Sequence, residues 1–394
     1  MLNDKGVREL AYVAEITDVK PIEGYDRVEL AVVNGGWTCV VGKGQFKPGQ
    51  LAVYFEIDSK LPEKPPFSDN EFIKKKKYKI TTQKMCKSIS QGLIMSFDEF
   101  DFDSSQYKKG DFLTELLEVT YAEPGDNKRK SAPKVNKYAK MAQRHPKAAK
   151  SAIWKWFWKL PNDRGKKILF ILFGKVKDKN GWPNWVVKTD EERIQNMPWV
   201  LESDDNRKHW IVTEKIDGTS TTFTLKKHGR KYDFYVCSRN VVFDEDEKGK
   251  CFYDVNYYTQ MAIKYNMKEV LTKIIKDLDC EWVTIQGETY GNGVQKRDYS
   301  IDFQDFVAFN LIDSKNGRWN SSAAEGYVKQ FGIYWVPIVD YDYTLPNSLE
   351  EMLEYADGES VLDGGMREGV VVRSSDAKTS FKAVSNSYLL RYHN

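Results

Sequence analysis

A short motif in the second half of the chain has the residues needed to form a covalent bond to a nucleotide. It reads Thr-Glu-Lys-Ile-Asp-Gly-Thr-Ser at positions 213–220, so Lys215 precedes Asp217 by two residues and Gly218 by three. A lysine amine attacks an α-phosphate only when it is unprotonated, which requires surroundings that lower its pKa. A divalent metal that Asp217 helps to hold could supply the positive charge, and Gly218 lets the backbone approach a ligand closely.

The segments beside this motif predict where the lysine lies. Residues 210–212 and 221–225 are rich in β-branched and aromatic side chains, which predicts that Lys215 lies in a short loop between two strands. By itself the motif also fits a charged hairpin turn, because so short a pattern arises by chance. The nucleotide-transfer interpretation therefore depends on further matches along the chain.

Five further segments downstream place polar or charged residues in or beside strand-like runs. They are Ser238-Arg239-Asn240 and Gln286-Gly287-Glu288 at the ends of runs, Val307-Ala308-Phe309-Asn310 inside one, Arg367-Glu368-Gly369-Val370-Val371-Val372, and Ser380-Phe381-Lys382-Ala383. In this order and spacing they resemble the motifs of the covalent nucleotidyltransferase superfamily, which contains DNA ligases, RNA ligases and mRNA capping enzymes. The resemblance is closest to the ATP-dependent RNA ligases, and within them to the fifth family, in which an OB domain precedes the nucleotidyltransferase domain.

The resemblance implies catalytic roles for five residues. Lys215 would be the nucleophile that forms lysyl-AMP from ATP. The carboxylates Asp217, Glu288 and Glu368 would bind or orient Mg²⁺ or Mn²⁺ and its waters, and Glu288 would also lie near the ribose. Lys382 would neutralise the phosphates and help to expel pyrophosphate. Phosphoryl transfer needs positioning and charge neutralisation more than covalent chemistry, apart from the one covalent lysine.

The resemblance also implies a set of nucleotide-binding residues. Arg239 would contact the ribose or phosphate region, Phe309 would stack on adenine, and Glu214 would contribute backbone contacts to the adenine. Gly218 would allow the ligand to approach the backbone. Lys188 is a candidate phosphate contact, because the stretch around it borders the nucleotide in the resembling family.

Two parts of the resemblance leave alternatives open. Residues 187–196 by themselves also fit the start of a helix, in which Thr189 and Glu192 would form a capping box. In the last motif many relatives carry two lysines separated by one residue, whereas this chain has Val384 at the second of these positions. Lys378 is therefore an alternative candidate for the final phosphate-binding lysine.

Each matched residue also has a structural interpretation, and two other functions compete with RNA ligation. Glu368 could be a charge at a strand edge, Phe309 a core ring and Lys382 a surface lysine. The nearer competing function is a ligase that acts on DNA ends. The further one is a non-catalytic RNA-binding protein that has kept the fold, and retention of Lys215 with three carboxylates argues against it.

Composition predicts a globular protein of two or three domains with a polyanionic partner. The chain has 394 residues, of which 13% are aromatic and 30% charged. Its net charge is only +3, but residues 121–180 carry 17 Lys or Arg and 4 Asp or Glu, a net +13. So uneven a distribution points to a polyanionic partner and predicts salt-sensitive binding. The resemblance implies that this partner is RNA, in the form of a nicked duplex or an RNA–DNA hybrid.

The order of predicted elements gives the domain organisation. Residues 1–120 contain β-rich runs separated by turn signals such as Asn34-Gly35, which predicts an OB-type β-barrel. A basic run at 74–79 is expected to be a loop or strand edge. Residues 182–394 mix strands and helices without regular alternation, which predicts an α+β domain. The resemblance implies that this is a nucleotidyltransferase domain of the ATP-grasp-like ligase type. Expected helices there lie within 253–279 and at 349–356, and one expected strand at 334–339.

Residues 121–181 are predicted to be a basic, aromatic-rich linker or helical insertion. Residues 135–159 are helix-prone, with an interruption at Pro146. One helical face would contain Ile153, Trp154, Phe157 and Trp158. We expect these rings to dock the segment onto a domain surface. Stacking on RNA bases and contact with a membrane surface are the alternatives.

Several classes of site are not indicated. Five cysteines without Cys-x-x-Cys spacing and four histidines without His-x-x-x-His spacing suggest neither a disulfide framework nor a zinc site. No run approaches 18 apolar residues, so a cytoplasmic protein without a membrane partner is expected. A monomer is also expected. The predicted reaction, which would serve RNA repair, adenylates Lys215 with ATP, passes AMP to an RNA 5′-phosphate, and joins it to a 3′-hydroxyl.

Overall fold

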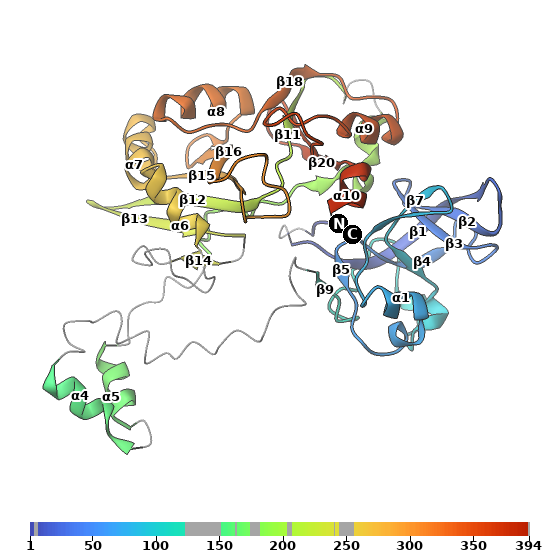
Figure 1. The fold of residues 1–394 in the computed structure, drawn as a ribbon, viewed down its shortest axis with the longest axis horizontal. Coiled ribbons are helices and arrows are strands. Elements are labelled where there is room, and N and C mark those ends of the chain that lie inside the picture. The colour runs from blue at the N-terminus through green and yellow to red at the C-terminus, as the bar shows by residue number, and fades with distance from the viewer. Residues whose placement is uncertain are drawn as a thin grey trace.

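The computed structural model shows two domains that contact each other and a separate pair of helices. It describes residues 1–3, 7–122, 151–161, 164–173, 182–202, 207–239, 241–243 and 256–392. In Figure 1 the N-terminal barrel is blue, the larger domain is yellow to red, and the green helix pair lies apart from both. In the described part of the chain no helix is both long enough and apolar enough to cross a membrane.

The N-terminal domain is the expected OB-type barrel. Its main sheet is antiparallel, in the order β3-β2-β1-β4-β8. The strands are β1 (Ala11–Ile22), β2 (Tyr25–Val33), β3 (Trp37–Gly42), β4 (Leu51–Phe55) and β8 (Leu93–Met95), with the smaller pairs β5 (Ser59–Lys60) with β9 (Thr120–Tyr121) and β6 (Thr82–Met85) with β7 (Ser88–Gln91). Asn34 and Gly35 adopt positive φ in the turn between β2 and β3, which confirms the hairpin signal.

Strand β1 supplies both cores of the barrel because its side chains alternate between two faces. Tyr12 and Ile16 pack into one buried cluster, and Ala11 and Val13 pack into the other. Both faces of β1 are therefore covered, and the strand is central to the domain.

The expected loop or strand edge at the basic run 74–79 was wrong only for its first two residues, because residues 76–78 form a turn and Lys79 forms an isolated bridge with Lys60. Lys74 and Lys75 end a short helix, α1 (Glu71–Lys75), and a turn follows. Asn70 caps this helix by accepting hydrogen bonds from the backbone N–H groups of the second and third helical residues, and Ile73 anchors it in the core. The cap and the one buried isoleucine outweigh the lysine repulsion.

Helices α4 (Ala152–Trp158) and α5 (Arg164–Phe173) pack against each other. Trp154 is buried and stacks on Trp158, and Gly165 approaches α4 so closely that a Cβ there would lie 1.7 Å from a backbone oxygen of Phe157. The expected shared face was wrong for Ile153, whose surface is 71% exposed. The predicted helix from 135 to 150 lies outside the described residues.

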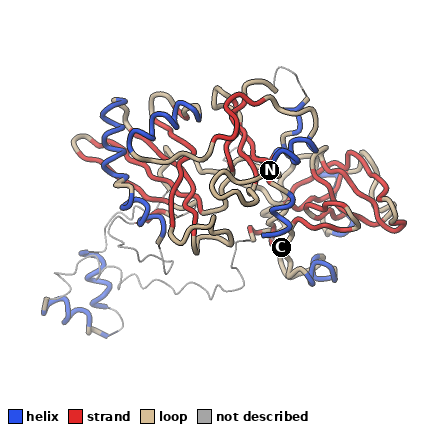
Figure 2. The backbone as a smooth tube through the Cα atoms, turned by 45° about the horizontal axis from the view of Figure 1, so that its top comes forward, coloured by secondary structure: helices blue, strands red, loops and turns tan. Residues whose placement is uncertain are grey.

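The C-terminal domain contains two sheets flanked by helices, which confirms the expected α+β class (Figure 2). One sheet has the order β10-β20-β19-β11-β18 and the other β14-β13-β12-β15-β16-β17. The strands of the first are β10 (Glu192–Arg193), β20 (Ser380–Val384), β19 (Gly369–Ser374), β11 (Trp210–Glu214) and β18 (Ile338–Tyr343). Those of the second are β14 (Val242–Phe243), β13 (Lys231–Cys237), β12 (Thr219–His228), β15 (Trp282–Gly291), β16 (Gln304–Asp313) and β17 (Gly317–Arg318).

Five α-helices complete the described part of this domain. They are α6 (Tyr257–Lys264), α7 (Met267–Leu278), α8 (Ser321–Val328), α9 (Leu349–Ala356) and α10 (Asn386–Tyr392). In the two domains, short 3₁₀ turns span Phe67–Asp69, Phe97–Glu99, Ser104–Gln106, Ile194–Asn196, Pro198–Leu201 and Lys329–Phe331.

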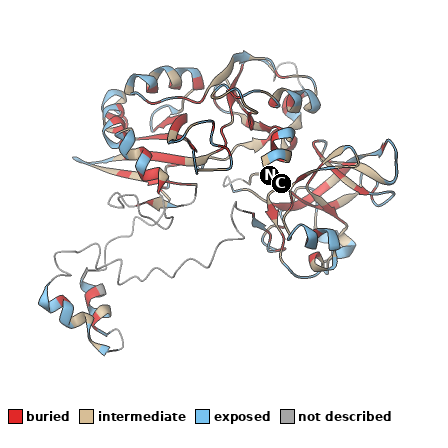
Figure 3. Cartoon of the chain, viewed as in Figure 1, coloured by how far each residue is buried: buried red, intermediate tan, exposed pale blue. Residues whose placement is uncertain are grey.

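The core of the C-terminal domain lies between α7 and the second sheet. The apolar residues of α7, which repeat every three or four positions, are buried there (Figure 3).

Two sequence expectations need correction in detail. The helix expected within 253–279 is divided into α6 and α7, because Asn266 takes a left-handed conformation with φ of 47°. The strand expected at 334–339 begins only at Ile338, since Trp335 forms no more than an isolated bridge with Ala308. The thiols of Cys39, Cys86, Cys237 and Cys280 are free.

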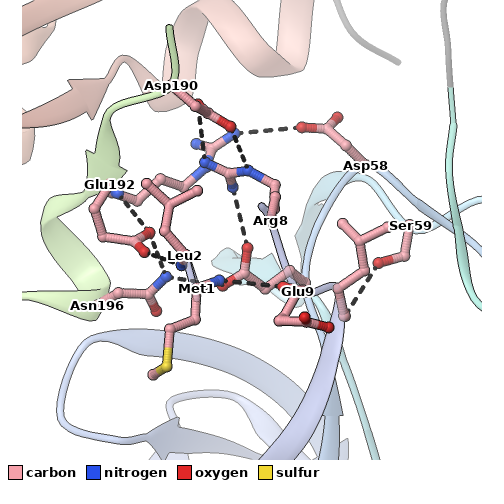
Figure 4. Close-up of polar contacts among 12 residues, drawn as sticks. Met1, Leu2, Arg8, Glu9, Asp58, Ser59, Asp190, Glu192 and Asn196 are labelled. Atoms are coloured by element: carbon pink, nitrogen blue, oxygen red, sulfur yellow. Dashed lines mark hydrogen bonds and ion pairs between the residues drawn. The ribbon is translucent and has the colours of Figure 1, made fainter. Parts of the chain in front are cut away.

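A buried ionic network joins the barrel to the C-terminal domain (Figure 4). Arg8 donates hydrogen bonds to Glu56 of the barrel at 3.1 Å and to Asp190 of the C-terminal domain at 3.2 Å. Asn196 donates to the same Glu56 at 2.8 Å and accepts from the indole N–H of Trp37 at 2.6 Å. Burial alone would lower the pKa of Arg8, but Asp190 and Glu56 outweigh it and raise the pKa.

Replacing Arg8 by alanine is expected to destabilise the fold strongly. Loss of one partner of a buried pair costs about 3–5 kcal/mol. The loss here should lie near the lower end of that range, because Asp190 keeps two other cations and Glu56 keeps the N-terminal ammonium. Urea unfolding of Arg8→Ala should show this loss, Arg8→Lys a smaller one, and the exposed control Arg230→Ala a change within about 0.5 kcal/mol. An Arg8→Ala protein as stable as the control would contradict the network's role.

Candidate nucleotide-transfer site

Lys215 lies in the predicted loop between two strands. Strand β11 ends at Glu214 and β12 begins at Thr219, so the loop has four residues. The backbone N–H of Lys215 donates to the carbonyl of Gly369 at 3.0 Å, which ties the loop to the start of β19. This bond brings Lys215 beside Glu368, the residue that precedes β19.

The side chain of Lys215 is held by carboxylates. Its Nζ atom lies 2.5 Å from Oε1 of Glu368, and 23% of its side-chain surface is exposed. Burial would lower the pKa of Lys215, but Glu368, Glu288 and Asp217 outweigh burial and raise that pKa. The amine is therefore a cation while these carboxylates are charged, and nucleophilic attack requires their charge to be offset.

Glu288 and Asp217 approach this lysine from two different segments. Glu288 lies opposite Ser220 in the pairing of β15 with β12, so it stands in the middle of β15 and not at the strand end that the sequence suggested. Burial, with Glu368 and Asp217 nearby, raises the pKa of Glu288 to about 8. When ionised, three carboxylates around one lysine carry more negative charge than that lysine can neutralise.

A hydrated divalent cation fits this arrangement better than a cation held by protein alone. Within the described residues, no three Asp, Glu, His or Cys side chains are close enough together to enclose a metal. Mg²⁺ in phosphoryl-transfer sites usually keeps several waters and uses one or two carboxylates together with substrate phosphates. Burial is the largest cause of the raised pKa of Glu288 because it disfavours the charged carboxylate, and a bound cation would offset part of that cost.

Close packing around the lysine loop requires glycine at two positions. A Cβ on Gly218 would lie 2.3 Å from the carbonyl oxygen of Thr289, and one on Gly287 would lie 2.2 Å from that of Val307. Phe309 stands at the irregularity in the pairing of β15 with β16 and is half-buried. One part of its ring packs on the core, as in the structural interpretation, and the rest can contact a ligand.

Glu214 is buried beside the lysine loop. Its carboxylate accepts a hydrogen bond from the backbone N–H of Val361 at 2.8 Å, and its own N–H donates to the carbonyl of Pro337 at 2.9 Å. Burial raises the pKa of the Glu214 carboxyl, although Ser360 and Val361 oppose it through hydrogen bonds. Its backbone has neighbours on both sides, Val370 of β19 and Pro337 next to β18.

A second cluster gathers cations around Asp190. Lys382 donates to this carboxylate at 2.7 Å and Arg239 at 2.5 Å, and Arg8 binds it from the barrel. Burial, with Arg8 and Arg193 nearby, lowers the pKa of Lys382 to about 8 although Asp190 opposes the shift. Lys382 and Arg239, both predicted to contact phosphate or ribose, are thus brought together by one acid.

The other phosphate candidates lie in more exposed places. Lys188 is exposed, with its Nζ 5.8 Å from the ring centroid of Trp182. Lys378 has 83% of its side chain exposed and pairs with Asp376 at 3.3 Å. Of the two lysines considered for the last motif, Lys382 is the one enclosed by the fold.

The helix start considered for residues 187–196 does not form. Thr189 bonds through its hydroxyl to Ser220 next to the lysine loop, and Glu192 lies in β10. The pairing of β10 with β20 sets Arg193 opposite Lys382. A strand position rather than a helix cap therefore explains this stretch.

Comparison with known proteins agrees with this architecture. A family model for an OB-fold domain matches residues 10–97, and a family model for RNA ligase matches residues 208–384. Residues 208–384 therefore form an RNA ligase domain. An OB-fold domain precedes the ligase domain, as the resemblance implied. No curated protein sequence matches this ligase significantly.

Solved structures of the Naegleria gruberi RNA ligase resemble this ligase over nearly its whole length. The structure with pyrophosphate is 28% identical, with a TM-score of 0.72 and coverage of 97% of this chain and 98% of that chain. A variant with ATP and Mn is 28% identical, with a TM-score of 0.73 and coverage of 98% and 100%. A variant with AMP and Mn has a TM-score of 0.71 at the same 28% identity, with coverage of 97% and 98%.

Sequence reasoning missed several residues that the fold of this ligase places at or near the two clusters. Asp190 and Arg193 lie in residues 187–196, the stretch that resembles the RNA ligases. The polar residues that follow Lys188 in this stretch could have indicated them. Arg193 is buried, with its Nε and Nη1 atoms lacking hydrogen-bond partners, beside Asp58 at 3.4 Å. Arg8 carried no local signal, because its partner lies 182 residues away.

Proposed function

We propose that this RNA ligase joins RNA 3′-hydroxyl and 5′-phosphate ends through lysyl-AMP and RNA-adenylate intermediates, at nicks in duplexes. ATP and a divalent metal are its cofactors, in keeping with the ATP, AMP and Mn bound to the Naegleria ligase. The observation that carries the proposal is the enclosure of Lys215, whose amine is paired with Glu368 at 2.5 Å and also lies in the field of Glu288 and Asp217.

In the first step the Nζ atom of Lys215 forms a bond to the α-phosphorus of ATP. The bond from that phosphorus to the bridging oxygen breaks, pyrophosphate leaves, and the amine gives up a proton. Bound Mg²⁺ would supply the positive charge that offsets the three carboxylates and neutralises the phosphates. Once their charge is offset, Glu368, Glu288 and Asp217 no longer hold the amine as a cation.

The neighbouring residues would hold the nucleotide during this step. Phe309 would stack on the adenine, and Glu214 would contact it through its backbone. Arg239 would bind the ribose or phosphates. The buried cations Lys382 and Arg193 would neutralise the departing pyrophosphate, since both lie on adjacent strands of one sheet.

The second and third steps transfer AMP and then release it. The RNA 5′-phosphate oxygen attacks the phosphorus of lysyl-AMP, and the bond to Lys215 breaks. The 3′-hydroxyl then attacks the activated 5′-phosphate, a phosphodiester forms, and AMP leaves. No covalent bond to the protein is needed in the third step.

The α4–α5 pair gives the RNA a positively charged surface outside the two main domains. Its described residues, 151–161 and 164–173, include five Lys or Arg and neither Asp nor Glu. Trp156 is 62% exposed on this surface, where a base could stack on it. Together with the barrel, this pair would hold the strands of a nicked duplex through salt-sensitive phosphate contacts.

Nick sealing tests the substrate. A labelled duplex with one nick is offered with RNA or with DNA on the 3′-hydroxyl side, in otherwise identical strands. The proposal expects sealing when RNA carries the 3′-hydroxyl and much slower sealing when DNA does. Equal sealing of both would favour a ligase for DNA ends.

The metal requirement is expected to depend on pH through Glu288. Its pKa is raised to about 8, so below that pH the carboxyl is mostly protonated and a bound metal must displace the proton. Apparent metal affinity should therefore rise by up to about tenfold per pH unit between pH 6 and 8 and then level off. The metal concentration for half-maximal labelling of the protein by ATP measures this. The slope should be reduced in Glu288→Gln, and an equally steep slope in that variant would contradict the assignment.

A further inference from the structure

Helix α10 contacts both the barrel and the nucleotide-transfer site. It follows β20 directly, and the N–H of Ser385, the residue before the helix, donates to the carbonyl of Glu368 at 2.9 Å. Figure 1 shows α10 between the strands of the barrel and β20. A helix of seven residues thus lies against two parts of the ligase that belong to different domains.

One side of α10 holds Asp217. The hydroxyl of Tyr388, a residue with no exposed surface, donates to Oδ2 of Asp217 at 2.7 Å. The backbone N–H of Asp217 in turn donates to the hydroxyl of Tyr299 at 2.6 Å. Hydrogen bonds to both its carboxylate and its backbone fix the orientation of Asp217, and the bond from Tyr388 uses only one carboxylate oxygen.

The other side of α10 is anchored in the barrel. Leu389, the residue after Tyr388, is 3% exposed and belongs to the same buried cluster as Tyr54. Gln91 of the barrel donates to the side-chain oxygen of Asn386 at 3.0 Å, and its own carbonyl accepts from the hydroxyl of Tyr54 at 2.8 Å. The position of the barrel therefore fixes the position of α10.

We propose that Tyr388 is a positioning residue through which docking of the barrel sets the orientation of Asp217. This inference rests on the proposed function, which assigns Asp217 to metal binding. Movement of the barrel away from the ligase domain would displace Leu389, and the adjacent Tyr388 would move with it. The barrel then contributes to the first step, the transfer of AMP to Lys215, in addition to holding RNA.

Replacing Tyr388 by phenylalanine tests the link because it removes one hydroxyl and keeps the ring. The metal concentration for half-maximal labelling of the protein by ATP should rise about tenfold, since a hydrogen bond to a charged group contributes about that factor or more. The KM for ATP should change less than about twofold at saturating metal, because the proposed role of Tyr388 is to orient the metal-binding Asp217 and not to bind ATP. Tyr392→Phe, on the same helix with its ring 4.5 Å from that of Tyr388, is the matched control and should keep the wild-type metal requirement.

A double-mutant cycle separates positioning from general damage. Mn²⁺ bound in the presence of ATP is measured by electron paramagnetic resonance in wild type, Tyr388→Phe, Asp217→Asn and the double variant, so slow labelling does not limit the comparison. If Tyr388 acts through Asp217, its replacement weakens Mn²⁺ binding in the wild-type background and changes nothing further beside Asp217→Asn. Asn386→Ala, which removes the bond to Gln91, should also raise the metal requirement, but by a smaller factor.

Three outcomes are distinguishable. Wild-type metal dependence in Tyr388→Phe would overturn the inference while leaving the ligase mechanism intact. An effect of Tyr388→Phe that persists fully beside Asp217→Asn would overturn it as well, since it would show a role independent of that carboxylate. Absence of any label on the wild-type protein would instead refute the lysyl-AMP mechanism on which the inference rests.

Discussion

Replacement of Lys215 by arginine should abolish transfer of AMP to the protein. Arginine keeps a positive charge beside Glu368, whose carboxylate lies 2.5 Å from the lysine amine, but its guanidinium remains protonated and does not attack phosphorus. Loss of a covalent nucleophile lowers such rates by at least about 10⁴-fold. Labelling by ATP carrying a radioactive α-phosphate, followed by denaturation, measures the effect.

The same variant separates the three steps. RNA that already carries AMP on its 5′-phosphate bypasses the first two steps, so Lys215→Arg should still seal it. Lys226→Arg is the matched control, because Lys226 also pairs with a glutamate, Glu281, at 3.2 Å, and it should label normally. Undiminished labelling of Lys215→Arg would show that another residue carries the AMP.

Replacement of Glu368 by glutamine is expected to lower the labelling rate by about a hundredfold or more. Two effects of this change oppose each other. Removal of the charge would lower the pKa of Lys215 and favour the neutral amine, since Glu368 is the strongest of the three carboxylates that raise that pKa. It would also remove a carboxylate that helps to hold the metal, and metal stabilisation of the transition state contributes several kcal/mol.

We expect the loss of metal binding to prevail. Labelling is measured across metal concentrations and pH, with Glu281→Gln as the control for removal of a carboxylate from an exposed Lys–Glu pair. Faster labelling of Glu368→Gln at neutral pH would contradict the metal role and leave Glu368 only as the partner that keeps Lys215 charged. Partial recovery of the labelling rate of Glu368→Gln at high metal concentration would agree with the metal role.

Local sequence patterns predicted helices and strands well where either the helical or the strand pattern of residues dominates. Helix α9 coincides with the expected 349–356, and the four early strands of the barrel fall where β-rich runs alternate with turn signals. The loop that carries Lys215 could be predicted because strands flank it on both sides. The first two lysines of the basic run at 74–79 were misread because the helix that they end depends on a single cap and one buried isoleucine, which are weak signals beside several lysines.

The site itself was only partly predictable, because its contacts join distant segments. Tyr388 and Asp217 are 171 residues apart, and Arg8 and Asp190 are 182 apart. No local pattern marks such pairs. The strand end expected at Gly287 was wrong, because β15 continues to Gly291. Glycine is needed at position 287 because the neighbouring strand leaves no room for a Cβ.

The most direct test of the account is to locate AMP on the protein. The purified ligase is freed of bound AMP with pyrophosphate, incubated with ATP and Mg²⁺, and digested, and its peptides are analysed by mass spectrometry. The account predicts one AMP per chain, on the peptide that contains Lys215, and its removal when pyrophosphate is added again. Absence of AMP, or AMP on another lysine such as Lys382, would contradict it.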